Sequence, residues 1–219
     1  MIRIGIADDE DLVRDGIAAL LSNQQGMIVV ATVSSAHEAV ELAGSGAIDV
    51  LLLDLDLGDR GGLDALADIR ARAARERTAA GSNAPTARVI VVSSFPEAEY
   101  AVRAVSAGAY GYIRKASDPA LLVQAIRTVA AGGRSITPEV ADLLADRASA
   151  GPSDPRHGLS DREHQILLLL GSGRSVVEIA DELSLSPSSV STYRRRILDK
   201  LDLPNTAAII RYVASRGLA

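Results

Sequence analysis

The sequence contains no cysteine, and of its 23 basic residues only Lys115 and Lys200 are lysines. The lack of cysteine excludes disulfides, thiolate metal ligands and a cysteine nucleophile. No apolar run is long enough to cross a membrane, and the N-terminus does not have the pattern of a signal peptide. These absences predict a cytoplasmic protein that makes no contact with a membrane. The two lysines either survive by chance or stand where a compact ammonium group is needed.

Acidic and basic residues are unevenly distributed along the chain. Residues 1–158 carry 21 acidic and 15 basic side chains, a net charge of −6, whereas residues 159–219 carry 7 and 8, a net charge of +1. The 219 residues, 47% of them apolar, can form two small domains that each have a core. Of the two parts, the C-terminal one is better suited to a polyanionic partner.

Five short apolar segments in the first 131 residues have the composition of buried strands, and a helical pattern follows each of them. The expected strands are Ile2–Ala7, Met27–Val33, Ile48–Leu53, Val89–Val92 and Tyr110–Ile113. This alternation predicts an α/β fold, a (βα)5 doubly wound parallel sheet with right-handed crossovers. The third of the expected helices should extend from Leu63 to about Arg75, and the polar segment Glu76–Ala87 should be a loop.

The pattern after residue 131 is helical and contains one linker. A helix is expected from Thr137-Pro138 to about Ala148, and the small, polar and proline-rich segment Ser149–Pro155 follows it. Beyond the linker, four short helices with serine or asparagine caps predict a small all-α domain. We therefore expect a first domain at residues 1–131, a linker region at 132–158 and a second domain at 159–219.

Polar side chains follow several of the predicted strands. Asp8 and Asp9 follow the first strand, Asp54 the third, Ser93 the fourth and Lys115 the fifth. These residues should meet at the carboxyl edge of the sheet, where open α/β folds bind ligands. Clustered carboxylates repel one another, and a cation such as Mg²⁺ relieves the repulsion while it leaves positions open for phosphate oxygens. Asp54 alone could instead cap a helix, but five such residues at one edge favour a phosphoryl-binding site.

Residues 1–131 resemble the receiver domain of two-component response regulators. The matching motifs are Ile6-Ala7-Asp8-Asp9-Glu10, Leu51-Leu52-Leu53-Asp54, Val91-Val92-Ser93 and Gly108-Ala109-Tyr110-Gly111-Tyr112-Ile113-Arg114-Lys115. The resemblance implies that a sensor histidine kinase phosphorylates Asp54, and that Mg²⁺ is bound by Asp8, Asp9, Asp54 and the backbone carbonyl of Asp56. It also implies that Ser93 moves onto the phosphoryl group, that Lys115 pairs with it, and that Tyr112 is an aromatic switch.

The segment after Asp54 departs from the receiver pattern. Gly58 stands where the family usually has proline, and Gly61 where it usually has an acidic or amide residue, which predicts a more mobile loop. Asp56 adds a charge close to the phosphoryl group and should alter its lifetime in a direction that the sequence leaves open. Asp54 and Asp56 also fit the D-x-D motif of haloacid-dehalogenase-type phosphohydrolases. That family has the motif on its first strand, however, whereas here Asp8 and Asp9 precede it.

Residues 175–201 have the pattern of a helix-turn-helix pair, and the second helix combines short hydroxyl side chains with basic ones. A solvated basic face would have the same composition. Residues 159–219 nevertheless resemble the LuxR-type domains of the NarL/FixJ class, through Leu159-Ser160-Asp161-Arg162-Glu163, Glu178-Ile179-Ala180 and Leu185-Ser186-Pro187-Ser188-Ser189-Val190-Ser191-Thr192-Tyr193. The resemblance implies that Ser191, Thr192 and Arg195 face base edges and that Ser189, Arg194 and Arg196 contact phosphates.

Together the two resemblances imply a transcription regulator, not an enzyme, in which phosphorylation of Asp54 controls DNA binding. The expected partners are a sensor histidine kinase, a DNA site with an inverted repeat and a second copy of the chain, with the final helix from Thr206 to Ala214 as the dimerising element. The alternatives are a receiver-fold transcription factor that works without phosphorylation and a D-x-D phosphohydrolase.

Overall fold

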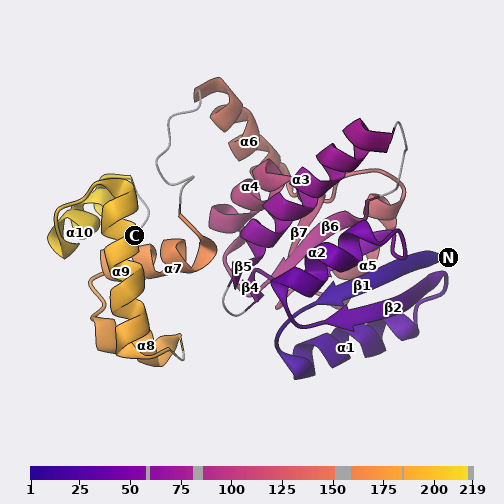
Figure 1. The fold of residues 1–219 in the computed structure, drawn as a ribbon, viewed down its shortest axis with the longest axis horizontal. Helices are drawn as coiled ribbons and strands as arrows, with labels where there is room; N and C mark the ends of the chain where they lie inside the picture. Colours follow the sequence, from indigo (N-terminus) through magenta and orange to yellow (C-terminus); the bar gives the residue numbers. More distant parts are fainter. Residues whose placement is uncertain (58–59, 81–85, 151–158, 184, 217–219) are drawn as a thin grey trace. The chain divides into compact units, whose positions relative to one another are not determined.

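In the computed structural model, which describes residues 1–219 apart from 58–59, 81–85, 151–158, 184 and 217–219, five parallel strands form one sheet. The strands are β1 (Ile2–Ala7), β2 (Met27–Val33), β3 (Val50–Leu53), β6 (Arg88–Ser93) and β7 (Gly111–Arg114). Their order is β2-β1-β3-β6-β7 (Figure 1). The chain divides into two compact units, Met1–Gly151, which holds this sheet, and Pro152–Ala219.

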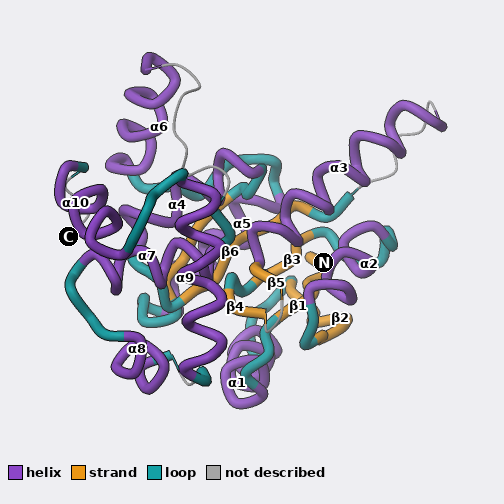
Figure 2. The backbone as a smooth tube through the Cα atoms, turned by 60° about the vertical axis from the view of Figure 1, so that its left-hand side comes forward, coloured by secondary structure: helices purple, strands orange, loops and turns teal. Residues whose placement is uncertain are grey.

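Helices cover both faces of the sheet, as Figure 2 shows in purple around the orange strands. Leu51 and Leu53 of β3 share a core cluster with α2 (Ala36–Gly44), α3 (Gly62–Ala80) and α4 (Glu97–Ala107). Val50 and Leu52 share another with α1 (Asp11–Ser22) and α5 (Pro119–Ala130). A strand that is buried on both faces needs a continuous apolar sequence, which β3 has. The predicted (βα)5 doubly wound sheet is confirmed.

This unit differs from the prediction at several points, including one residue at each end of β6 and of β7. Strand β3 begins at Val50 instead of Ile48, and a short antiparallel hairpin of β4 (Asp56–Leu57) and β5 (Arg60–Gly61) follows Asp54, where only a loop was expected. Helix α3 extends to Ala80, so the prediction of a loop from Glu76 is wrong for residues 76–80. Those five residues include glutamate, arginine and alanine, which are good helix formers, and the glycine and proline lie in 81–85, outside the described residues.

Residues 131–137 connect α5 to α6 (Pro138–Ala150), and Ser135 in this connection pairs with the edge strand β7. Ser135 N–H donates to the Tyr110 carbonyl at 2.8 Å, and Tyr112 N–H donates to the Ser135 carbonyl at 3.3 Å. Helix α6 packs on α4 in the first unit, and its Val140 is 1% exposed. The helix is two residues longer than predicted and includes Ser149; the rest of the expected linker, from 151, lies outside the described residues.

The described residues of the second unit form four helices, as predicted: α7 (Asp161–Gly171), α8 (Val176–Glu182), α9 (Pro187–Leu201) and α10 (Thr206–Ser215). Both predicted capping boxes are present, Ser160 with Glu163 and Ser175 with Glu178. The helices enclose a core whose members are buried aliphatic side chains, among them Ile166, Ile179, Ile197 and Ile209. Within the described part of the chain, no helix is both long and apolar enough to span a membrane.

Candidate functional site

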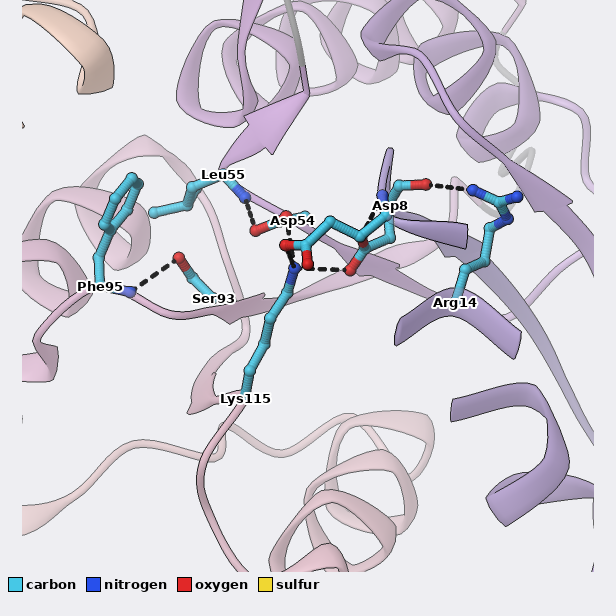
Figure 3. A network of polar contacts seen from close by, with 8 residues as sticks. Asp8, Arg14, Asp54, Leu55, Ser93, Phe95 and Lys115 are labelled. Carbon is cyan, nitrogen blue, oxygen red and sulfur yellow. Dashed lines mark hydrogen bonds and ion pairs between the residues drawn. The ribbon is translucent and has the colours of Figure 1, made fainter. Parts of the chain in front are cut away.

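Asp54 follows β3 directly and is held at the carboxyl edge of the sheet. Its side chain is buried, its N–H donates to the Ala7 carbonyl at 2.8 Å, and its Oδ1 accepts from the Leu55 N–H at 2.6 Å (Figure 3). Gly62, the first residue of α3, passes so close that a Cβ there would lie 2.2 Å from the Asp54 carbonyl oxygen. Only glycine fits at this position without displacing the backbone of Asp54.

Lys115 places its ammonium group among three carboxylates. Its Nζ lies 2.8 Å from Asp54 Oδ2, 2.9 Å from Asp8 Oδ2 and 3.1 Å from Glu10 Oε1. The backbone of Lys115 is fixed at the end of β7, because its N–H donates to the Ser93 carbonyl at 2.8 Å. Arg14 holds the other side of the cluster by donating to the Asp8 carbonyl at 2.8 Å (Figure 3). The strand ends therefore bring Asp8, Asp54, Ser93 and Lys115 to one edge, as the sequence predicts.

The protein environment changes the acidity of this cluster. Burial raises the pKa of Asp54 to about 7, although the charge of Lys115 opposes the shift. Burial also disfavours the Lys115 ammonium, but its ion pairs with Asp54 and Asp8 outweigh this and hold its pKa above the usual value. A carboxyl with a pKa near 7 is partly protonated at neutral pH, and only its ionised form is a nucleophile. A cation beside Asp54 would favour the ionised form.

The carboxylate oxygens of Asp8, Glu10 and Asp54 lie within 4.8 Å of one another, and oxygen donors are the ligands that Mg²⁺ prefers. The cluster therefore fits the expected cation. Glu10 was not among the predicted ligands, although it follows Asp8 and Asp9 in the sequence. Burial raises the pKa of Asp9, and the nearby charges of Asp56 and Asp8 add to the effect. Asp9 and Asp56 lie outside the Asp8, Glu10 and Asp54 group, so their role as ligands stays a prediction.

Ser93 and Tyr112 are joined through Phe95. The N–H of Phe95 donates to Ser93 Oγ at 3.2 Å, and the Tyr112 hydroxyl donates to the Phe95 carbonyl at 2.9 Å. The Phe95 ring stacks on Tyr100 of α4 with the ring centroids 4.6 Å apart. Ser93 and Tyr112 are both buried. One short loop thus connects the edge that holds Asp54 to the first turn of α4.

Helix α9 separates an apolar side from a polar one. It buries Val190, Ile197 and Leu201, whereas Thr192, Arg195 and Arg196 are exposed. Residues three or four positions apart share a helix face, so Thr192 and Arg195 lie together on the side away from the core. Two predicted hydroxyl contacts are engaged within the helix, because Thr192 Oγ1 donates to the Ser188 carbonyl at 3.0 Å and Ser189 Oγ lies 2.8 Å from Ser186 Oγ. Ser191 and Arg194 are half-buried beside this face.

Lys200, which belongs to the same basic helix, has a structural contact that the sequence does not indicate. Its Nζ donates to Glu163 Oε2 at 2.6 Å, and the buried Glu163 side chain also closes the capping box at the start of α7. The interaction ties α9 to α7. Both lysines of the chain therefore pair with buried carboxylates, which favours the explanation that a compact ammonium group is needed at each position.

Two family models match the chain, and together they span most of it. Residues 4–127 match the response regulator receiver domain, and residues 157–213 match the bacterial regulatory proteins of the luxR family. The chain is 34% identical to response regulator GacA of Pseudomonas aeruginosa, over 100% of this chain and 98% of that protein. It is 33% identical to response regulator UvrY of Escherichia coli, over 100% and 96% of the two chains.

Solved structures show the same architecture. A LuxR-family two-component response regulator from Aurantimonas is 34% identical, with a TM-score of 0.55, and the match covers 67% of this chain and 97% of that chain. The response regulator RcsB in complex with DNA is similar over 98% of both chains, with a TM-score of 0.53. At 24% identity this second similarity concerns the fold alone.

Proposed function

The chain belongs to the response regulators that join a receiver domain to a LuxR-type DNA-binding domain, and from this premise we propose that Asp54 is its phosphoacceptor. It is a phosphorylation-controlled, DNA-binding regulator of transcription in a two-component system. The observation that carries the assignment is the buried carboxylate of Asp54, which lies 2.8 Å from the ammonium of Lys115 at the carboxyl edge of the sheet. The matches to transcription regulators support this function over the phosphohydrolase alternative.

In the proposed reaction, a carboxylate oxygen of Asp54 forms a bond to phosphorus, and the bond between phosphorus and the histidine nitrogen of the sensor kinase breaks. Asp8, Glu10 and Asp54 would hold Mg²⁺ together with Asp9 and the carbonyl of Asp56. The bound cation supplies positive charge to the phosphoryl oxygens. Lys115 already contacts the attacking carboxylate and would stay beside the acyl phosphate, where its ammonium stabilises the added negative charge.

We infer that the signal travels from Ser93 to α6 through groups that are in contact. Ser93 Oγ moves onto the phosphoryl group and gives up the Phe95 N–H, which changes the loop whose carbonyl holds the Tyr112 hydroxyl. Because Phe95 stacks on Tyr100 of α4, a movement of the loop would also move α4. Helix α4 holds the start of α6, because Thr137 Oγ1 donates to Glu97 Oε1 at 3.0 Å and Val140 is buried in the core of the receiver unit. The segment that leads to the DNA-binding unit is thus coupled to Asp54.

The DNA-binding unit acts, in this proposal, as a cytoplasmic homodimer on an inverted repeat. Helix α9 enters the major groove with Ser191, Thr192 and Arg195 toward the bases, and Arg194, Arg196 and Ser189 approach the backbone on either side. Helix α10 exposes Ile210 at 41% and would pair with its copy in the partner subunit. The cognate sensor histidine kinase is the proposed source of the phosphoryl group.

Sedimentation velocity of the full chain tests the link between phosphorylation and assembly. In Mg²⁺ alone the protein should sediment mainly as a monomer, and addition of acetyl phosphate should shift it toward a dimer because the phosphorylated state exposes or orders the pairing surface. The Asp15→Asn variant, which changes an exposed acid on α1, is the matched control and should behave like the wild type. A distribution that acetyl phosphate leaves unchanged, in a sample shown by mass to carry the phosphoryl group, would contradict the proposal.

A further inference from the structure

A cavity of about 690 Å³ opens at the edge of the sheet opposite to Asp54. It lies between the starts of β3 and β6, the middle of α3 and the end of α4, and its lining includes Asp49, Arg88 and Tyr110. Asp49 and Asp54 are five residues apart, so roughly 16 Å of extended chain separates the two edges. A cavity of this size is typical of sites for small molecules. None of the steps proposed for phosphorylation uses it.

Three arginines from separate segments converge on this cavity: Arg70 of α3, Arg88 of β6 and Arg134, which follows α5. Each is anchored by one bond to a backbone carbonyl. Nη1 of Arg70 donates to the Ser106 carbonyl at 3.1 Å. Nη1 of Arg88 donates to the Ala130 carbonyl at 3.2 Å, and Nη1 of Arg134 donates to the Ala109 carbonyl at 3.1 Å. Because a guanidinium has five N–H donors, each arginine keeps donors that these bonds do not use.

In the described part of the chain, no acid lies close enough to balance the charge of these arginines. Among the residues that the structure describes, no carboxylate lies within 4.0 Å of any of the three guanidiniums. Asp49 is the acidic residue in the described lining, and Arg3 holds it with an Nη2 to Oδ1 distance of 2.7 Å. Three cations that no described carboxylate contacts thus share one cavity in the acidic part of the chain. Exposed arginines scattered on a surface would be unremarkable, but these three face one hollow.

Tyr110 holds two of the guanidiniums in place. The Arg134 guanidinium carbon lies 5.3 Å from the centre of the Tyr110 ring, and that of Arg88 lies 5.9 Å from it. Both distances are within the range of cation–π contacts. These contacts and the hydrogen bonds to backbone carbonyls orient the two guanidinium groups before any ligand binds. The N–H donors of an oriented guanidinium match the oxygens of phosphate and carboxylate groups.

We propose that this cavity binds a small polyanion with two or more phosphate or carboxylate groups, and that the ligand acts on the regulator independently of Asp54. Arg134 immediately precedes Ser135, which pairs with β7, and α6 begins three residues later. A ligand held by Arg70, Arg88 and Arg134 would tie this connection to α3 and β6. It would thereby restrict the movement of α6 that phosphorylation requires. The ligand would then be a second signal, besides phosphorylation of Asp54, that controls DNA binding.

Isothermal titration calorimetry with inorganic pyrophosphate tests the site, on the full chain at constant ionic strength and in buffers freed of divalent cations by passage over a chelating resin. The wild type should bind pyrophosphate and should not respond to acetate at the same concentration. Arg88→Gln and Arg134→Gln should each weaken binding at least tenfold, because each removes charged hydrogen bonds to the ligand. Arg75→Gln, an exposed arginine on α3 outside the lining, is the matched control and should bind as the wild type does.

Two further measurements keep the test decisive. Arg134→Lys, at an exposed position, keeps the positive charge and should retain part of the affinity, so a loss in Arg134→Gln cannot be ascribed to unfolding. Pyrophosphate should also slow amide hydrogen exchange in residues 134–137. The proposal is overturned if pyrophosphate does not bind, if the Gln variants bind it as tightly as the wild type, or if affinity is lost in Arg194→Ala instead, which would place the anion on α9.

Discussion

The wild-type chain is expected to gain one phosphoryl group from acetyl phosphate in the presence of Mg²⁺, and the Asp54→Asn variant is expected to gain none. An amide cannot form the acyl phosphate, and the other acids of the cluster are not in the same position: Asp54 is the carboxylate that follows β3, with its Oδ1 held by Leu55 and its Oδ2 by Lys115. Intact-mass spectrometry before and after incubation measures the result directly.

Two variants separate the nucleophile from the groups around it. Asp9→Ala should also block phosphoryl uptake, because the cation that neutralises the phosphoryl oxygens would be lost. Asp15→Asn, which changes an exposed acid of α1, should leave uptake unchanged. An equal mass gain in Asp54→Asn and the wild type would mean that another residue accepts the phosphoryl group.

Replacement of Arg195 by alanine should cost roughly 1–3 kcal/mol of binding free energy on the chain's preferred DNA site and should relax the base preference at one position of each half-site. Arg195 and Thr192 are exposed on the face of α9 opposite to Val190 and Ile197. Arg194→Ala and Arg196→Ala should instead weaken binding to all sequences alike and reduce the salt slope by about one unit each.

A binding selection from a random oligonucleotide pool, repeated at two salt concentrations, distinguishes the two effects. The exposed Arg211 of α10 offers a matched control, and Arg211→Ala should select the same motif as the wild type. The preferred site should be an inverted repeat with half-sites about one helical turn apart. If Arg195→Ala lowers affinity without changing the selected motif, Arg195 contacts the backbone and not the bases.

The sequence predicted the arrangement of the sheet because its signals are local and strong. The run of apolar residues before Asp54 is too short for a lone helix and indicates a strand buried on both faces, and four further segments of this kind predict the (βα)5 order. Parallel strands then place Asp8, Asp54, Ser93 and Lys115 at one edge without any knowledge of side-chain geometry. Serine caps and capping boxes located the starts of α7, α8 and α9 for the same reason.

Features that depend on contacts between distant residues could not be predicted. The pairing of Lys200 with Glu163 joins residues 37 positions apart, and nothing near either residue indicates it. Arg70, Arg88 and Arg134 are scattered in the sequence and meet only because α3, β6 and the end of α5 reach the same edge. The end of α3 is hard to predict for another reason: residues 76–80 include good helix formers, but a segment that contains glycine, serine and proline follows them directly.

The affinity of the full chain for its selected DNA site, measured by fluorescence anisotropy with and without acetyl phosphate and Mg²⁺, tests the central claim most directly. Phosphorylation of the wild type should tighten binding by roughly tenfold or more, the range of ordinary allosteric coupling, because the phosphorylated receiver favours the dimer. Asp54→Asn should bind with the affinity of the unphosphorylated wild type under both conditions. Equal affinities for the phosphorylated and unphosphorylated wild type, or the same tightening in Asp54→Asn, would contradict control of DNA binding through Asp54.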